Sequence, residues 1–203
     1  MAPALLRARK TPRQARSAVT VEAIHAATIQ VLLTVGAVRL TTTRVAERAG
    51  VSVGTMYQYY PNKQALMFAI VQRQLEAVER AFLEVAEQLA GHDLQTIAHG
   101  LAEAWLNAKT ADIEASRAIY GVAAEFDITT LMEQGTQRLR QGVAYVLETA
   151  SDARFSDVDE VAFMLLAMLG GSVRAVMELG ASEPDLACLR RELPRACYGY
   201  LRV

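Results

Sequence analysis

The sequence predicts an all-α protein of about nine helices. Hydrophobic residues make up 52% of the 203 positions, whereas Gly and Pro, which interrupt helices, number only 12 and 5. Apolar residues recur at helical spacing between strong start and stop signals, and no segment shows the alternation typical of a half-buried strand. This composition argues against a disordered chain and is sufficient for a sizeable core.

The first predicted helix covers residues 17–35 and is closed by Gly36. Its apolar positions fall on one stripe, which consists of Val21, Ile24, Ala27, Thr28, Val31, Leu32 and Val35. The stripe predicts a helix with one buried face.

Two short helices are predicted next, each with its own cap. Thr41 caps a helix that Gly50 stops, because glycine adopts the left-handed conformation of a helix end. Ser52 caps a third helix, Val53–Tyr59, which Pro61 terminates.

A long fourth helix is predicted from its cap, Asn62, to about residue 90, and it belongs to both halves of the chain. Gly180 and Pro184 mark the last helix break. Five further helices are predicted at residues 93–109, 112–125, 128–150, 157–179 and 184–201.

The net charge of −1 hides an asymmetry between the two parts of the chain. Residues 1–63 hold nine basic and two acidic side chains, a net charge of +7, whereas the remaining residues hold 12 basic and 20 acidic ones, a net charge of −8. A basic first third on an acidic body indicates that the first third meets a polyanion, although a solvated basic tail is the simpler alternative.

The sequence predicts a cytoplasmic protein without a membrane segment. The longest apolar run, residues 161–173, is shorter than the roughly 18–20 residues that a span needs. The N-terminus has no apolar core like that of a signal peptide. Cys188 and Cys197 are too few for a disulfide framework or a metal cage, which leaves a redox switch between them as the alternative.

The two short helices and the Ala-Gly-Val-Ser turn between them, residues 49–52, have the layout of a helix-turn-helix. Gly50 permits a sharp reversal that a residue with a Cβ would resist. A small core is expected from Val45, Ala46, Ala49, Val51, Met56 and Tyr60.

The other positions of this motif are expected to point outward, toward DNA. Thr42 and Thr43 lie at the start of the second helix, where free N–H groups favour a phosphate. Short side chains at the start of the third helix allow its backbone to enter a major groove. Contacts to bases or phosphates are expected from Val53, Gly54, Thr55, Tyr57 and Tyr59, and a further phosphate contact from Lys63.

The segment TTTRVAERAGVSVGTMYQYYPNKQAL, residues 41–66, resembles the signature of the tetracycline-repressor (TetR) family of bacterial transcriptional regulators. With the first helix, the match covers about residues 17–68. The resemblance implies a three-helix DNA-binding module whose third helix reads bases. Met56 and Tyr60 stand where Leu and Phe are common in the family, so the Tyr60 hydroxyl needs a partner or a water. Base-reading positions implied by the family are Thr43, Val53, Gly54, Thr55, Tyr57 and Tyr59, and phosphate positions are Thr42, Tyr57 and Lys63.

Three parts follow from the motif and the charge: a flexible basic arm at residues 1–16, a helix-turn-helix domain at 17–63, and a helical ligand-binding and dimerisation domain at 64–203. The arm either reaches an adjacent minor groove or only raises non-specific affinity. The resemblance implies that helices 157–179 and 184–201 pair with those of a second subunit in a four-helix bundle.

Gly170 and Gly171 lie in the middle of the first of these helices, where each costs roughly 1 kcal/mol relative to Ala. Close backbone approach across a subunit interface explains them. The alternatives are a kink or a tight contact within one subunit.

An apolar or aromatic ligand is expected in the body, on large adaptable side chains of the middle helices. The candidates are Trp105, Tyr120, Phe126, Met132, Tyr145, Phe163, Met164 and Met168, with His99, Asn107, Arg117, Glu125 and Gln134 as possible polar contacts. The alternative is that these side chains are ordinary core. His92 and His99 lie seven residues apart without a third ligand, so no metal site and no cofactor are expected.

The sequence therefore predicts a homodimeric, ligand-responsive repressor of a palindromic DNA operator. No Gly-rich phosphate loop and no nucleophile–histidine signature is present, so we expect no enzyme and no catalytic residue. The alternatives are a DNA-binding dimer of the same fold without a small-molecule ligand, an activator, and a helical interaction module that does not bind DNA.

Overall fold

A computed structural model describes residues 15–123 and 126–202. The described residues form nine helices and no strand, which confirms the predicted all-α class. Most of the basic arm, residues 1–14, lies outside the described residues, and α1 begins at Ala15, inside the predicted arm. The helices are α1 (Ala15–Arg39), α2 (Thr42–Ala49), α3 (Val53–Tyr59), α4 (Lys63–Gln88), α5 (Leu94–Thr110), α6 (Ile113–Ala123), α7 (Thr129–Glu148), α8 (Val158–Glu178) and α9 (Glu183–Leu201).

The chain divides into two compact units, and the divisions fall within α4, within α6 and near the start of α7. Unit 1 contains Met1–Gln74 and Arg117–Thr130, and unit 2 contains Leu75–Ser116 and Leu131–Val203. The inclusion of residues 117–130 in unit 1 follows from long-range contacts, which the helix pattern of the sequence did not indicate.

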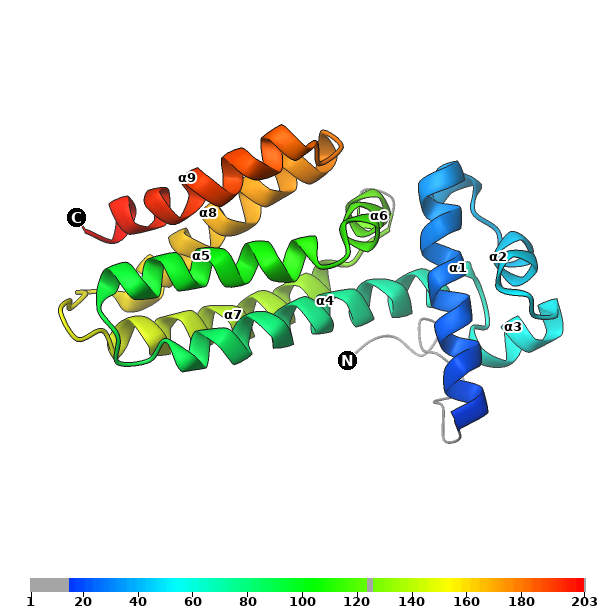
Figure 1. Cartoon of the computed structure of the whole chain (residues 1–203). Coiled ribbons are helices and arrows are strands. Elements are labelled where there is room, and N and C mark those ends of the chain that lie inside the picture. Colours follow the sequence, from blue (N-terminus) through cyan, green and yellow to red (C-terminus); the bar gives the residue numbers. More distant parts are fainter. Residues whose placement is uncertain (1–14, 124–125, 203) are drawn as a thin grey trace. The chain divides into compact units, whose positions relative to one another are not determined.

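In unit 1, α1 packs against α2 and α2 packs against α3 (Figure 1). Ile24, Val45 and Met56, one from each helix, are fully buried. The predicted helix end at Gly36 is only a kink, because Gly36 takes a φ of 78° and a ψ of 166° and the helix then resumes to Arg39. The positive φ explains why a glycine stands at this position.

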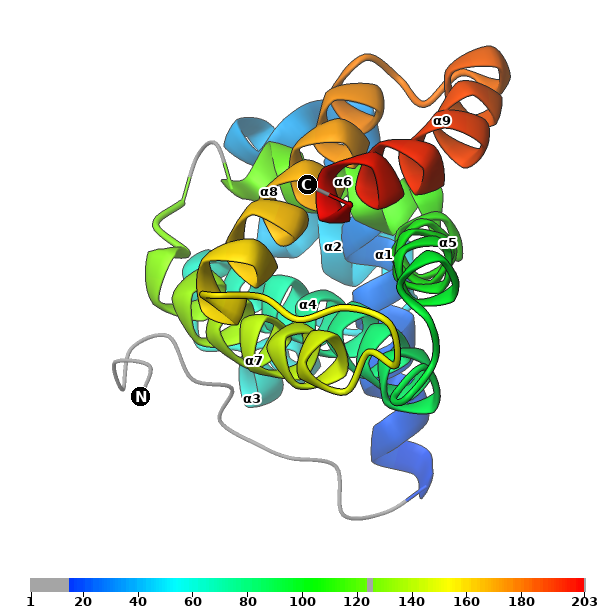
Figure 2. The same cartoon turned by 90° about the vertical axis from the view of Figure 1, so that its left-hand side faces the viewer.

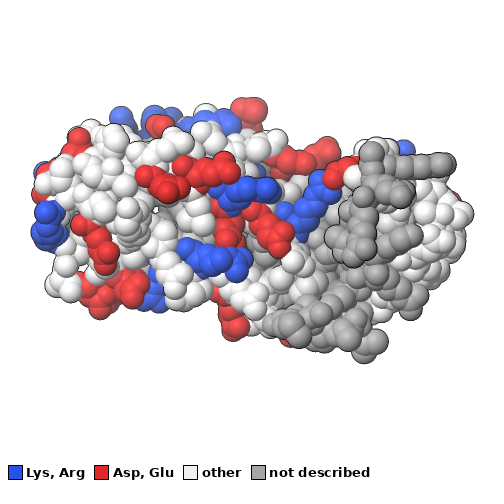
Figure 3. Space-filling model, turned by 90° about the horizontal axis from the view of Figure 1, so that it is seen from below, with Lys and Arg blue, Asp and Glu red and all other residues white. Residues whose placement is uncertain are grey.

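In unit 2, α5 packs against α8 and α9, and α8 and α9 lie side by side (Figures 1 and 2). Arg138 of α7 holds Glu79 of α4 with two hydrogen bonds of 2.5 and 2.7 Å. Acidic and basic side chains are interspersed over the face of this unit that Figure 3 shows. Such a face carries no strong field of one sign.

The sequence predicts no membrane span, but two helices have the length and composition of one. Both Ser17–Arg39 and Val158–Glu178 reach a mean hydropathy of 1.6 over 18 residues, with 44% and 28% of that window buried. Core helices of soluble proteins pass the same test, and the apolar stripe of α1 packs within unit 1. The two helices are therefore weak evidence for a membrane span.

The glycine pair in α8 has open space around it. A Cβ added at Gly170 or Gly171 would meet no atom within 4 Å, so a tight contact within the described chain does not explain the pair. The backbone of α8 also carries no non-helical residue of the kind found at Gly36 of α1. Approach by a second chain stays a prediction.

Cys188 and Cys197 do not pair. Both lie on α9, one exposed and one buried, and both are free thiols. A rise of 1.5 Å per residue separates them by roughly 13 Å along the helix, beyond the roughly 7 Å that a disulfide spans between Cα atoms. The predicted redox switch between these two residues within one chain is therefore wrong.

Candidate nucleic-acid interface

The helix-turn-helix is built on the caps that the sequence predicts. The Thr41 hydroxyl accepts from the Arg44 N–H at 3.3 Å, and the Ser52 hydroxyl accepts from the Thr55 N–H at 3.0 Å. Gly50 takes a φ of 67° and its N–H donates to Glu47 at 3.2 Å, which closes α2. These bonds satisfy backbone groups at both ends of the turn, and all of them lie within residues 41–55.

Asn62 caps α4 as predicted, because its Oδ1 accepts from the Ala65 N–H at 2.7 Å. Tyr60, between α3 and this cap, takes an extended conformation with a φ of −124°. Pro61 favours such a conformation in the residue before it, so the chain turns here from α3 into α4.

Four of the eight predicted DNA contacts lie on the exposed side of the motif. Thr43 and Gly54 are exposed, Val53 is 37% exposed, and Tyr57 is 42% exposed. They lie at the starts of α2 and α3 and along α3, where Gln58, next to Tyr57, is exposed as well.

Two predicted contacts do not point outward as expected. Tyr59 is 7% exposed, and Thr42 is 8% exposed with its hydroxyl 3.2 Å from that of Tyr57. Met56, Tyr59 and Tyr60 are spaced i, i+3 and i+4, the spacing of one helix face, and all three are buried. This spacing was the signal for the burial of Tyr59. The contact between Thr42 and Tyr57 joins α2 to α3.

Thr55 and Lys63 are half-buried and already hold partners within unit 1. The Thr55 hydroxyl lies 2.8 Å from the Ser52 hydroxyl of the α3 cap. The Lys63 ammonium donates to the Val38 carbonyl at 2.9 Å and lies 5.7 Å from the centre of the Phe126 ring. A phosphate contact from Lys63 would have to share the ammonium with this carbonyl.

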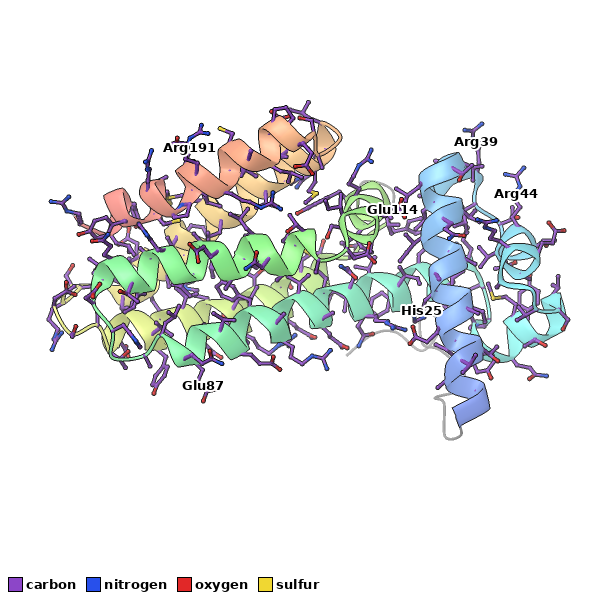
Figure 4. The ribbon with its side chains drawn as sticks, in the orientation of Figure 1. His25, Arg39, Arg44, Glu87, Glu114 and Arg191 are labelled. Atoms are coloured by element: carbon purple, nitrogen blue, oxygen red, sulfur yellow. The ribbon has the colours of Figure 1, made fainter. Side chains whose placement is uncertain are left out.

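Basic side chains beside the motif extend its positive surface, and sequence reasoning did not name them as contacts. Arg39 and Arg44 project outward from α1 and α2 (Figure 4). Arg44 donates to the Arg39 carbonyl at 3.0 Å, and Arg48 donates to Gln30 of α1 at 2.6 Å. Residues 1–63 contain more basic than acidic side chains, and this excess was the signal in the sequence that could have identified these arginines.

A polar network joins α1 to α4 inside unit 1. His25, which is 8% exposed, extends from α1 toward α4 (Figure 4). Its Nε2 lies 2.7 Å from the Tyr60 hydroxyl and its Nδ1 lies 2.8 Å from Nη1 of Arg73, which also forms an ion pair with Glu22 at 2.6 Å. The Tyr60 hydroxyl thus has the partner that the sequence requires for it.

Burial and the neighbouring guanidinium set the protonation states of this network. Burial, and next the charge of Arg73, lower the pKa of His25 from 6.5 to about 4. Burial raises the pKa of Tyr60 to about 12. The hydrogen bond from Arg73 lowers the pKa of Glu22. At neutral pH the network therefore consists of a neutral imidazole and phenol beside one ion pair.

The eight ligand-pocket candidates do not share one environment. Tyr120 and Phe126 belong to unit 1, and the other six belong to unit 2. Of the six candidates in unit 2, only Trp105 is buried, at 7% exposure, whereas Met168 is half-buried. Four are exposed on the described chain, namely Met132, Tyr145, Phe163 and Met164 at 43%, 55%, 51% and 40%. The candidates of unit 2 therefore do not form one buried set on the described chain, and the role of each in ligand binding stays a prediction.

An open groove of about 410 Å³ lies on unit 2. Its lining is mostly polar and includes none of the eight candidates; it consists of Leu89, Asp93, Gln95, Thr96, His99, Gly100 and Glu103. His92 precedes α5 in a turn whereas His99 lies within α5, so the two histidines do not share a helix face. Within the described ranges, no three His, Cys, Asp or Glu side chains are grouped to hold a metal ion.

Two protein-family models match this chain. The model of bacterial regulatory proteins of the tetR family matches residues 24–70, and the model of the tetracyclin repressor-like C-terminal domain matches residues 93–201. The second match alone covers more than half of the chain. The protein belongs to the tetracycline repressor family, and it is a helix-turn-helix transcriptional regulator.

Solved structures share the fold at low sequence identity. The fatty acid degradation regulator FadR from Bacillus halodurans has a TM-score of 0.72 at 18% identity, over 95% of this chain and 98% of its own. SmeT, the repressor of the Stenotrophomonas maltophilia multidrug efflux pump SmeDEF, has a TM-score of 0.68 at 22% identity, over 89% of this chain and 88% of its own. The SmeT–triclosan complex has a TM-score of 0.67 at 21% identity, over 89% and 90%. A search of curated proteins found no match.

Proposed function

We propose that the protein is a cytoplasmic, homodimeric, ligand-responsive repressor that binds a palindromic operator. The observation that carries the DNA-binding part is the exposed start of α3, where Gly54 and Val53 leave the backbone uncovered and a capped turn fixes the helix. A helix end with short side chains fits a major groove, and two copies on a two-fold axis meet successive grooves one turn apart.

The base contacts that we propose are Thr43, Val53, Gly54, Thr55 and Tyr57, with phosphate contacts from Thr42, Tyr57 and Lys63. The exposure of Thr43, Val53, Gly54 and Tyr57 supports the proposal, whereas the burial of Tyr59 and Thr42 makes these two residues the weakest members of the predicted set. Few long polar side chains lie at this end of α3. We therefore expect DNA shape and dimerisation to supply much of the specificity.

The dimer interface that we propose is the outer face of α8 with α9. Phe163, Met164 and Leu179 expose 51%, 40% and 81% of their surface on the described chain. Gly171 is exposed between them with open space above it, so a partner helix can approach the backbone closely. Large apolar side chains that one chain leaves exposed along a helix are consistent with a protein–protein interface.

The ligand part of the proposal rests on the helical body. Triclosan binds SmeT, a structural neighbour, which is consistent with a small apolar ligand here. Because α4 runs continuously from unit 2 into unit 1, a ligand-dependent shift of α4 in the body would reach the DNA-binding motif. A coupling of about 1–3 kcal/mol between the two sites is enough for a switch.

Selection of sheared genomic DNA by the purified protein at two salt concentrations tests this function. We expect enrichment of one palindromic sequence, with binding that weakens steeply as the salt concentration rises because phosphate contacts release counterions. A folded dimer that enriches no sequence at either salt, after extraction of co-purified small molecules, would contradict the proposal. Enrichment of an operator whose occupancy no small molecule alters would support a DNA-binding dimer without a ligand.

A further inference from the structure

The side chain of Trp105 on α5 has a buried donor without an acceptor. The residue is 7% exposed, and its indole Nε1–H finds no hydrogen-bond partner in the described structure. A buried polar group without a partner costs roughly 1–3 kcal/mol, so native proteins seldom retain one without a reason. An acceptor beside Nε1 would recover that free energy.

A cationic side chain lies next to this indole. Lys109 is one helical turn after Trp105 on α5, and its ammonium lies 5.1 Å from the centre of the indole ring. Burial lowers the pKa of Lys109 to about 8, so the side chain still carries its charge at neutral pH. The positive charge thus lies in a partly dehydrated position inside a body whose net charge is −8.

Buried apolar side chains lie beside Trp105, on α4 and on α5 itself. The edge of the Trp105 ring meets Phe82 of α4 with ring centres 5.4 Å apart and an interplanar angle of 89°. Phe82 and Leu101 are fully buried, and Leu106 is 2% exposed. A ligand that reaches the indole therefore has to be largely apolar.

We propose that Trp105 and Lys109 form the anchor for the ligand of this regulator, and that this ligand is an apolar carboxylic acid. The carboxylate accepts from the Trp105 Nε1–H and from the Lys109 ammonium, and the apolar remainder lies against the side chains around Phe82. The proposal rests on the ligand-responsive function proposed above and specifies the chemistry of its ligand.

The chemistry of the two donors favours an anion over a neutral group. An indole nitrogen and an ammonium only donate hydrogen bonds, so a group that only accepts is the complement of both. An ionised acceptor forms shorter and stronger bonds than a neutral one, most of all where water is excluded. The position of Lys109 in the last turn of α5 explains a cation there, because the helix dipole favours it, but does not explain a buried indole N–H without an acceptor.

The experiment compares matched probes on the full chain. Octanoate, dodecanoate and 4-phenylbutyrate are titrated beside 1-octanol, 1-dodecanol and 4-phenylbutanol, with emission of the single tryptophan and thermal unfolding as readouts. We expect at least one acid to bind about tenfold more tightly than its alcohol, the ratio that one charge-assisted hydrogen bond supplies. We expect that acid to shift the Trp105 emission and raise the midpoint of thermal unfolding.

Variants assign the preference to the two donors. Lys109→Met and Trp105→Phe should each lower the acid-to-alcohol ratio about tenfold while the affinity for the alcohol stays the same, with thermal unfolding as the readout for Trp105→Phe. Arg80→Met, at an exposed basic position of unit 2, is the matched control and should keep the wild-type ratio. Circular dichroism checks that each variant remains folded.

Three results would overturn the proposal: no acid binding more tightly than its alcohol, a preference that Arg80→Met removes as well, or a preference that survives both variants. The last result would mean that groups other than Trp105 and Lys109 bind the carboxylate. These outcomes are separable from a failure of the proposed function, because direct binding is measured without DNA. A regulator that releases its operator only with neutral ligands would retain the proposed function and lose the acid anchor.

Discussion

His25 Nδ1 accepts a hydrogen bond from Nη1 of Arg73 at 2.8 Å, across 48 residues of sequence. Because a guanidinium only donates, Nδ1 is unprotonated and the proton of the neutral imidazole lies on Nε2, which donates to the Tyr60 hydroxyl at 2.7 Å. Arg73 is the residue before Gln74, where α4 leaves unit 1. This chain of bonds therefore ties α4 to α1 at the edge of the DNA-binding unit.

The His25 site predicts a loss of stability in mild acid. The pKa of His25 is about 4 in the folded chain, whereas the ordinary pKa of a histidine, which applies to the unfolded chain, is 6.5. The unfolded chain therefore binds the proton more strongly. The stabilisation is complete above about pH 6.5 and is lost progressively as the pH falls toward 4. Between pH 7.5 and 5.0 we expect the free energy of unfolding to fall by about 2 kcal/mol from this group, measured by urea unfolding at both values.

His25→Gln should remove most of this pH dependence, because glutamine does not titrate. His92→Gln removes an exposed histidine and should leave the pH dependence as in the wild type. Glu22, the acidic neighbour of His25, stays ionised over this range because the hydrogen bond from Arg73 holds the pKa of Glu22 low. An equal pH dependence in wild type and His25→Gln would contradict the assignment.

Removal of the Tyr60 hydroxyl should destabilise unit 1. Tyr60→Phe leaves the buried Nε2–H of His25 without its acceptor, at a cost of about 1–2 kcal/mol in the free energy of unfolding. Tyr57→Phe is the matched control: its hydroxyl bonds to Thr42, but the residue is 42% exposed and water can replace the bond. Urea unfolding at pH 7.5 should separate the two variants, and equal losses would show that the network does not stabilise α1 against α4.

Gly54 should be needed for DNA binding and not for folding. A Cβ at this position would meet only the Ser52 hydroxyl oxygen, at 3.7 Å, an ordinary contact, and alanine is the better helix former by up to about 1 kcal/mol. If the α3 backbone enters the groove, Gly54→Ala lowers operator affinity about tenfold while the protein becomes no less stable.

The control for this variant is Gly121→Ala, the same substitution at an exposed position of α6 with no atom within 4 Å of the added Cβ. Fluorescence anisotropy on the selected operator is the measurement. Wild-type affinity in Gly54→Ala would place this backbone away from the DNA.

Gly171 should be needed for dimerisation and not for the fold of one chain. Open space around its Cβ position means that Gly171→Gln fits on the described chain, whereas a partner helix against α8 would clash with it. We expect at least a tenfold weaker dimer by light scattering, a loss of about 1.4 kcal/mol, with unchanged helicity. Gly121→Gln, at an exposed glycine of a different helix, α6, is the control. A Gly171→Gln protein as dimeric as this control would require another interface.

Local signals in the sequence were sufficient to predict the helices and the helix-turn-helix motif. Thr41, Gly50 and Ser52 cap and stop α2 and α3 where the sequence predicts, because a cap acts on backbone groups within three or four residues of it. The spacing of Met56 and Tyr60 on one helix face likewise predicted their burial.

The candidate interface was predicted only in part. The turn and the exposed start of α3 follow from the motif, but Tyr59 and Thr42 are covered by packing among α1, α2 and α3. Helical periodicity defines which residues share a face, and it does not define which face another helix covers. The same reason explains why the pocket candidates do not share one environment. Tyr145 and Phe163 lie on exposed helix faces, and no local pattern in the sequence distinguishes such a face from a buried one.

The family, the caps and the order of the helices were all present in the linear sequence, because each depends on neighbours a few residues apart. The bond between His25 and Arg73, the neutral state of that histidine and the unpaired indole of Trp105 beside Lys109 required the folded chain. Each of them depends on how helices dock against one another and how much water that docking removes.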